Sequence, residues 1–174
     1  LAAVGAGILL SSIRAIRIVV DGSSAGAVDG LTLTADRAQI FGLAITNFAG
    51  AGIYADAGNG IVLRGNLIGT DASGMLDRGN ILGIGVAAGI SGGIIGGYLP
   101  HHRNVISGNV GGIICSNDYA LISGNYIGTT ADGSGNLGNA GSGILAQGLS
   151  SRIEQNTIRF NAARGIGVSG AGSR

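Results

Sequence analysis

The stretch Leu63-Arg-Gly-Asn66-Leu-Ile68 decides the fold, because its pattern returns along the chain. An aliphatic residue is followed three positions later by Asn or another aliphatic residue, and two positions after that by Ile. Self-similarity at a period of roughly 20–50 residues is typical of a solenoid, in which each repeat is one stacked unit. The other copies are Ile13-Ile16-Ile18, Ile40-Leu43-Ile45, Ile122-Asn125-Ile127, Ile153-Asn156-Ile158 and His101-Asn104-Ile106, the last with His at the first position.

A second marker, Gly followed by an aliphatic residue, lies between copies of the first, and long and short connections to it alternate. A longer duplication is also visible. Residues 66–80, NLIGTDASGMLDRGN, align without gaps to residues 125–139, NYIGTTADGSGNLGN, at an offset of 59, and the register continues to Ile94 and Ile153. The sequence therefore predicts one domain over residues 1–174, with less regular rungs over 1–39, regular repeats over 40–174 and a duplicated two-rung unit.

The composition favours strands over every other architecture. The chain has 36 Gly but only 1 Pro and no Gly-X-Y period, which excludes collagen, and its 45% hydrophobic content argues against disorder. Glycine disfavours helix, and short β-branched pieces between Gly, Asn, Asp and Ser are typical of strands and turns. Such short strands bury a continuous core only when stacked as parallel ladders about 4.8 Å apart. We expect an all-β, single-stranded parallel β-helix of about six to seven rungs.

Residues at fixed phases predict how the corners of this coil are built. Asn side chains at one phase are expected to form an internal hydrogen-bonded ladder from rung to rung, at corners where Asn tolerates left-handed backbone. These ladder residues are Asn66, Asn104, Asn125 and Asn156. Glycines at another phase are expected to supply the positive φ of a second corner; they are Gly52, Gly112, Gly143 and Gly165. One rung is expected to return at Ile94 and then to carry an extra loop that contains Pro100.

Two segments carry the pattern N-x-I-x-x-N-x-x-(x)-G-I, which runs from about residue 40 to the end of the chain. They are Ile153-Glu-Gln-Asn-Thr-Ile-Arg-Phe-Asn161-Ala-Ala-Arg-Gly-Ile166 and Asn104-Val-Ile-Ser-Gly-Asn109-Val-Gly-Gly-Ile113. They resemble the right-handed parallel β-helix repeats of the pectin-lyase-like superfamily, in particular its carbohydrate-binding and sugar-hydrolase type of repeat. The resemblance implies a right-handed coil. It does not imply one activity, since members include polysaccharide lyases, hydrolases and epimerases, phage tailspikes and adhesins.

No catalytic set of that superfamily is recognisable. The nine acids include no adjacent pair, and the chain has no Lys to complete a polygalacturonase-like set. Asp71 and Asp132 occupy the two homologous loops, where they are expected to form turns; the alternatives are acid/base chemistry or a Ca²⁺ held with water. Pro100-His101-His102 is similar to an epimerase motif but lacks both of its carboxylates. The candidate binding residues are Asp71, Asp132, Arg78, His101 and His102, with no catalytic residue and no bound metal or cofactor expected.

The charges and the single thiol exclude several partners. The ten Arg are scattered without a stripe and aromatic residues are few, so no nucleic-acid surface is expected. The lone Cys115 sits in an apolar stretch and is expected to be a small buried side chain. The apolar segment Leu1–Leu10 is shorter than the ~20 residues of a membrane span and lacks the basic flank of an export signal. It is expected to form a first strand or a cap.

These features predict a structural or adhesive solenoid, extracellular or on a cell surface. Neither end of the sequence has the pattern of a polar capping helix, so the repeat is expected to stack end to end with further copies or to belong to a longer chain. The alternative is a carbohydrate-active enzyme or glycan-binding module. That alternative predicts that Arg64, Arg78 and Arg103 share one face with the loops of Asp71 and Asp132. Polysaccharide is the partner it implies. An ice-binding solenoid is disfavoured, because the Thr residues are scattered.

Overall fold

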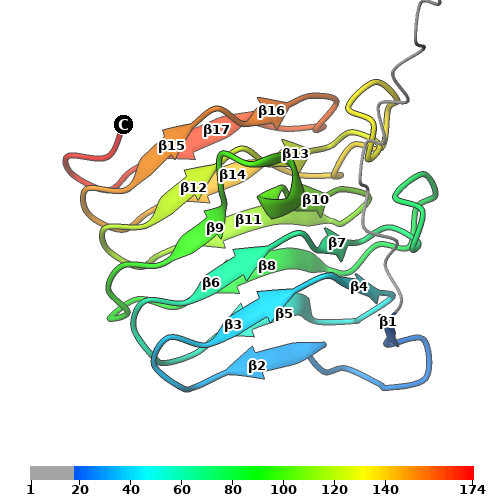
Figure 1. Cartoon of the computed structure of the whole chain (residues 1–174), viewed down its shortest axis with the longest axis horizontal. Coiled ribbons are helices and arrows are strands. Elements are labelled where there is room, and N and C mark those ends of the chain that lie inside the picture. Colours follow the sequence, from blue (N-terminus) through cyan, green and yellow to red (C-terminus); the bar gives the residue numbers. More distant parts are fainter. Residues whose placement is uncertain (1–17) are drawn as a thin grey trace, which may run out of the picture.

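The computed structural model describes residues 18–174, which coil into a right-handed parallel β-helix (Figure 1). Three parallel sheets run along the coil, and each turn of the chain adds one strand to each sheet. The all-β parallel solenoid that the sequence predicted is therefore confirmed. Leu1–Leu10 and the first two residues of the first motif copy, Ile13 and Ile16, lie outside the described residues.

The strands are two to five residues long. Sheet A contains β1 (Ile18–Asp21), β4 (Leu43–Thr46), β7 (Leu67–Ile68), β10 (Val105–Ile106), β13 (Tyr126–Ile127) and β16 (Thr157–Ile158). Sheet B contains β2 (Leu31–Leu33), β5 (Ala51–Ala55), β8 (Leu82–Val86), β11 (Gly111–Cys115), β14 (Ile144–Ala146) and β17 (Ile166–Val168). Sheet C contains β3 (Gln39–Phe41), β6 (Val62–Arg64), β9 (Ile94–Gly96), β12 (Leu121–Ser123) and β15 (Arg152–Glu154).

The core consists of aliphatic columns, one from each sheet. The parallel register places identical positions of successive rungs above one another, so inward side chains stack at the strand spacing. All members of these columns are at most 2% exposed. The columns are Ile45–Ile68–Ile106–Ile127 in sheet A, Ile53–Ile84–Ile113–Ile144 in sheet B and Leu63–Ile95–Ile122 in sheet C. The interior is therefore filled by stacked Ile and Leu side chains, with little contribution from the large aromatic residues that many globular cores contain.

The predicted asparagine ladder is present at the corner between sheets C and A. Nδ2 of Asn66 donates to Oδ1 of Asn104 (3.1 Å), and the same bond joins Asn104 to Asn125 (2.9 Å) and Asn125 to Asn156 (2.9 Å). Each Nδ2 also donates to a main-chain carbonyl of the strand below, as Asn104 does to Leu63 (2.8 Å). Because these amides are buried, they satisfy corner groups that water does not reach.

A second ladder, which the sequence analysis did not identify, runs along the corner between sheets A and B. Asn80, Asn109, Asn139 and Asn161 are joined by Nδ2 to Oδ1 bonds of 3.0, 3.1 and 2.8 Å. The signal was in the repeat pattern, whose second Asn gave Asn109 and Asn161. Asn80 and Asn139 follow long loops, whereas Asn109 and Asn161 follow short turns. This difference in length concealed that all four occupy the same position of the rung.

The predicted roles of the corner residues need correction. None of Asn66, Asn104, Asn125 and Asn156 has positive φ, and neither have Gly52, Gly112, Gly143 and Gly165. At three of the four corners the left-handed residue is the one before the ladder asparagine, namely Gly65 (φ 62°), Gly124 (φ 66°) and Gln155 (φ 57°), whereas Arg103, before Asn104, has φ −61°. Gly112 is instead required by space, because a Cβ there would overlap the carbonyl oxygen of Gly143 in the next rung. The sequence shows that a corner needs Gly but not whether the need is conformational or steric.

The rung with the extra loop returns at Ile95 and not at Ile94. Ile95 pairs with Leu63 and Ile122 and is buried, whereas Ile94 pairs with Val62 and points outward. The gapless alignment would match Ile94 to Ile153. In the structure Ile153 pairs with Ile122, and Ile122 pairs with Ile95, so the alignment is lost before β9. His101, predicted at the first position of a motif copy, belongs to no strand. It lies in the short 3-10 helix η1 (Pro100–His102) and is exposed.

Candidate functional site

The two homologous long loops fold into small hairpins at the corner between sheets A and B. Bridges between Thr70 and Asp77 and between Thr129 and Asn136 close them. The loops lie two rungs apart, and the intervening rung has only a short turn there, so they meet directly: the N–H of Ala131 donates to the carbonyl of Gly74 (2.9 Å). The duplicated sequence therefore builds one continuous structure on this side of the coil.

The carboxylates of Asp71 and Asp132 are used inside their own loops. Asp71 accepts hydrogen bonds from the N–H groups of Met75 and Leu76 and from the hydroxyl of Ser73. Asp132 accepts from the hydroxyl of Thr130 and from the N–H and hydroxyl of Ser134. They are the turn formers that the sequence favoured.

These hydrogen bonds also set the charge of the two carboxyl groups. The Thr130 hydroxyl and the Ser134 N–H lower the pKa of Asp132 to about 2. Burial raises the pKa of Asp71, but hydrogen bonds from Ser73, Leu76 and Met75 outweigh it and hold that pKa below its ordinary value. Both groups are anionic at neutral pH with their oxygens engaged, so neither is suited to general acid/base work, which needs a pKa near the working pH.

Acid is expected to destabilise the protein through these loops. A carboxyl group whose folded pKa lies below its unfolded value of 3.8 contributes stability above that value and loses it as the pH falls toward the folded pKa. The guanidinium concentration at the unfolding midpoint should therefore decrease as the pH is lowered from about 4 to about 2. In the Asp132→Asn variant, the midpoint at pH 7 should be lower than in the unchanged protein, and it should decrease less between pH 4 and pH 2. Guanidinium titrations followed by circular dichroism at pH 7, 4 and 2.5 would measure it.

The matched control for that experiment is Asp56→Asn. Asp56 is exposed, and its side chain makes no hydrogen bond to residues 18–174. Its replacement should leave both the midpoint at pH 7 and the acid dependence as they are in the unchanged protein. An equal response of the two variants would mean that the loop carboxylate is not the group that acid titrates.

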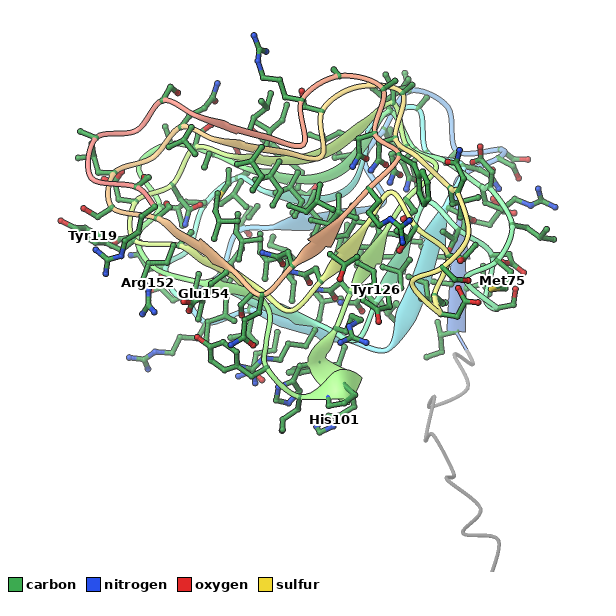
Figure 2. All side chains as sticks on the ribbon, turned by 90° about the horizontal axis from the view of Figure 1, so that it is seen from above. Met75, His101, Tyr119, Tyr126, Arg152 and Glu154 are labelled. Atoms are coloured by element: carbon green, nitrogen blue, oxygen red, sulfur yellow. The ribbon has the colours of Figure 1, made fainter. Side chains whose placement is uncertain are left out.

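The remaining candidate residues are divided between the two edges of sheet A. Arg78 lies near the end of the first long loop, between sheets A and B, and its guanidinium donates only to the carbonyl of its neighbour Asp77 (2.8 Å). His101 and His102 lie at the opposite edge, in the extra loop between sheets C and A; Met75 and His101 mark the two sides in Figure 2. The predicted site is thus not one cluster. Arg64 and Arg103 also lie at the corner between sheets C and A, away from Arg78, so the arginines do not share one face.

One contact crosses the outer face of sheet A between these edges. The guanidinium of Arg103 lies 4.0 Å from the centroid of the Tyr126 ring, a cation–π geometry, while its Nε donates to the carbonyl of Gly124 (3.0 Å). On its other side the Tyr126 ring contacts the second long loop at Gly133. Arg103 is therefore a structural group that ties the extra loop to sheet A.

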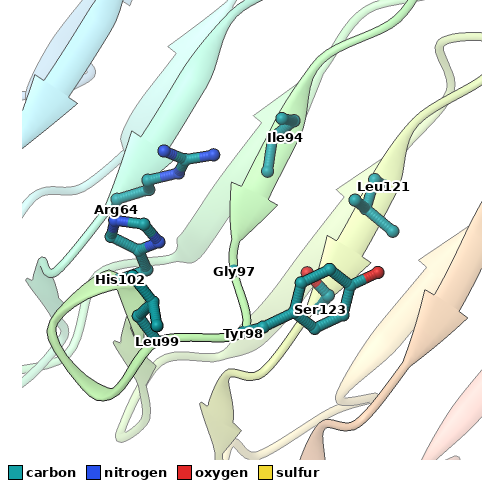
Figure 3. Close-up of a pocket in the computed structure, with 8 residues that line it drawn as sticks. All are labelled: Arg64, Ile94, Gly97, Tyr98, Leu99, His102, Leu121 and Ser123. Atoms are coloured by element: carbon teal, nitrogen blue, oxygen red, sulfur yellow. The ribbon is translucent and has the colours of Figure 1, made fainter.

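The extra loop also folds over sheet C and forms the hollow shown in Figure 3, with a volume of about 350 Å³. Its floor is the outer face of β9 and β12, and its rim is the loop that leaves Gly97. The lining residues are Arg64, Ile94, Gly97, Tyr98, Leu99, His102, Leu121 and Ser123. Of the predicted binding residues, only His102 belongs to it.

Polar contacts hold the rim of this hollow. The Tyr98 hydroxyl donates to Oε1 of Glu154, two rungs above, and Glu154 forms an ion pair with Arg152 (3.0 Å). The bond from Tyr98, ahead of the charge of Arg152, keeps the pKa of Glu154 below its ordinary value. Burial, followed by the charges of Arg64 and His101, lowers the pKa of His102. Its imidazole is therefore neutral at neutral pH, and Arg64 is the charged group of the lining.

The hollow could not be predicted from the sequence, although the insertion that creates it could. The insertion was visible as a delayed return between Ile84 and the next motif copy. Nothing in the sequence indicates that the loop folds back over sheet C, because that direction depends on the Tyr98–Glu154 contact between positions 56 residues apart.

Cys115 is buried as predicted, with its thiol 2.9 Å from Oδ1 of Asn117. Burial raises the pKa of this thiol to about 12, so it is unreactive in the folded protein.

No protein-family model, curated protein or solved structure matches this chain. Within residues 18–174, no three His, Cys, Asp or Glu side chains are grouped so that they could hold a metal ion. The same part of the chain contains no helix long and apolar enough to cross a membrane.

Proposed function

We propose that this protein is a structural or adhesive β-solenoid, extracellular or on a cell surface, whose ends associate with further copies of itself. The observation that carries the proposal is the pair of open ends in the described coil. Within residues 18–174, strands β1, β2 and β3 at one end, and β16 and β17 at the other, each pair with a strand on one side only. The outer edge of β15 is partly covered by the last residues, since the N–H of Ile153 donates to the carbonyl of Arg174 (2.7 Å). Open edges of this kind are templates for further pairing.

The core columns are also incomplete at these ends. Ile40 at the first end and Ile153 and Ile158 at the second are only partly buried, whereas the equivalent positions of the middle rungs are fully buried. Stacking a second coil would cover these side chains, and each square ångström of apolar surface removed from water contributes about 25 cal/mol.

Within residues 18–174, the charges at the two ends of the coil are complementary. The described part of the first rung, residues 18–42, has three Asp and one Arg, a side-chain net charge of −2. Residues 150–174, at the other end, have four Arg and one Glu, a net charge of +3. Complementary ends favour a head-to-tail arrangement, which extends into a filament when the rotation does not close. With six rungs at about 4.8 Å, such a filament would repeat about every 30 Å.

Sedimentation velocity over a range of protein concentrations tests the proposal. The mean mass should grow with concentration and fall as salt is added, because salt screens exposed charges. The double variant Arg159→Glu and Arg164→Glu should weaken the association, whereas Arg78→Glu, a charge reversal on the lateral loop, should not. A monomer at every concentration, or equal effects of the end and lateral variants, would refute the proposal.

A carbohydrate-active enzyme using the long-loop face is the weaker proposal. It needs a carboxylate or a cation free to contact the glycan, and the Asp71 and Asp132 oxygens are engaged within their turns. The arginines that it requires on one face lie at the two edges of sheet A.

A further inference from the structure

The hollow on sheet C arises from the sequence of one outward-facing column. Arg64, Gly96, Ser123 and Glu154 follow one another across β6, β9, β12 and β15. Gly96 and Ser123, the two middle positions, have little or no side chain. A gap therefore opens between the cation Arg64 at one end of the column and the anion Glu154 at the other. The loop after Gly97 then closes one side of the gap instead of filling it.

The lining of the hollow is apolar with a single charged group. Ile94 and Leu121 form the floor from the neighbouring outward column, and the exposed side chains of Tyr98 and Leu99 stand at the rim. No acidic residue lines the hollow. The charged group is Arg64, whose Nε donates to the carbonyl of Gly96 (3.1 Å). Its two terminal amino groups make no hydrogen bond to residues 18–174, so they are available to an anion.

An unsatisfied polar atom lies in the same lining. The Oγ of Ser123 is buried and is the only buried side-chain oxygen or nitrogen of residues 18–174 without a hydrogen-bond partner. Ser123 and Tyr98 both belong to the lining of the hollow in Figure 3. A buried hydroxyl without a partner destabilises a folded protein. This oxygen has no accessible surface, so a molecule in the hollow does not touch it, and the free guanidinium of Arg64 is the polar group that a ligand meets.

The geometry points to this hollow as a binding site for a small amphipathic carboxylate, an apolar ring with one carboxylate group. The ring packs on Ile94 and Leu121 against the Tyr98 side chain. The carboxylate takes two hydrogen bonds from the Arg64 guanidinium, whose planar fork suits a carboxylate. The site lies on the lateral face of the middle rungs, so it does not depend on association of the ends.

The test uses 3-phenylpropanoate as the probe and its neutral amide, 3-phenylpropanamide, as the matched compound. Two-dimensional NMR of the labelled full chain should show shifts of the backbone N–H signals of Gly96, Gly97 and Ser123 on adding the carboxylate. The hollow is shallow and the probe is small, so the expected dissociation constant is about 1 mM. The amide should bind about tenfold more weakly, because it lacks the charge that pairs with Arg64.

Variants separate this site from a merely structural hollow. Ser123→Ala should raise the thermal unfolding midpoint by about 2–4 °C, since it removes an unpartnered hydroxyl, and should leave binding of the carboxylate unchanged, because this oxygen has no accessible surface. Arg64→Gln should abolish the preference for the carboxylate over the amide. Arg64→Lys should retain much of it, because the positive charge is kept. Arg78→Gln, on the lateral loop, should change neither binding nor stability.

Three results would overturn the inference. The first is the absence of shifts at 10 mM 3-phenylpropanoate in the folded protein. The second is equal affinity for the carboxylate and the amide. The third is binding of a neutral oligosaccharide, cellohexaose, that shifts the same signals and is unaffected by Arg64→Gln, which would assign the hollow to a glycan.

Discussion

Asn104→Ala should lower the free energy of unfolding by about 3–5 kcal/mol, one of the largest losses for any polar residue of this protein. The Asn104 side chain is fully buried. Its Oδ1 accepts from the N–H (3.0 Å) and Nδ2 (3.1 Å) of Asn66, and its Nδ2 donates to the Leu63 carbonyl (2.8 Å) and to Oδ1 of Asn125 (2.9 Å). Alanine leaves the Asn66 N–H buried without a partner, at a cost of about 1–3 kcal/mol, and removes three further hydrogen bonds of the ladder.

Guanidinium titration followed by circular dichroism would measure this loss. The matched control is Asn136→Ala, which removes an exposed asparagine that accepts a single hydrogen bond, from the N–H of Gly138 (3.1 Å). Its cost should stay below about 1 kcal/mol. If the two variants lost equal stability, the ladder would contribute no more than an ordinary surface turn.

Gly128→Ala should cost about 4 kcal/mol, whereas Gly89→Ala should cost about 1 kcal/mol. The two glycines have the same left-handed backbone, with φ of 86° and 85°. A Cβ at Gly89 meets no atom within 4 Å. A Cβ at Gly128 would overlap the Arg159 carbonyl oxygen and lie 2.7 Å from Oδ1 of Asn161. Only Gly128 therefore adds a clash with the next rung to the backbone strain.

The clash at Gly128 cannot be relieved locally, because the obstructing atoms belong to the main chain and to an asparagine of the second ladder. Moving them would break the pairing of β13 with β16 and the Asn139–Asn161 bond. The denaturation midpoints of the two variants provide the measurement. Equal losses would show that backbone strain alone decides the effect and that the rungs have room to separate.

The architecture could be predicted because the same sequence pattern occurs in every rung. Ile at one phase and Asn at another define an inward column and a buried corner, and parallel stacking is the arrangement that places identical residues together. The Asn66–Asn104–Asn125–Asn156 ladder follows from the same argument, since an amide can donate to its copy in the next rung. The exact return at Ile95 could not be predicted, because Ile94 and Ile95 are both aliphatic and only pairing with Leu63 and Ile122 separates them.

The candidate site was predicted far less well. Asp71, Asp132 and Arg78 were chosen by residue type, and their own loops use them. His101 was predicted at the first position of a motif copy, beside the extra loop, and lies in the exposed 3-10 helix η1. Tyr98, Ser123 and Arg64 were not recognised as neighbours, since no local pattern joins them.

The sequence by itself thus determined the coil, its isoleucine core and the first asparagine ladder, because each depends on contacts between equivalent positions. It also determined the turn-forming role of Asp71 and Asp132, because their hydrogen bonds are to residues within five positions in the chain. Tertiary structure alone decided where the long loops touch, which glycines need space and how the extra loop lies over sheet C. Those features depend on contacts between non-equivalent residues, such as Tyr98 with Glu154. A repeat specifies what lies above each residue, but it does not specify what an inserted loop will meet.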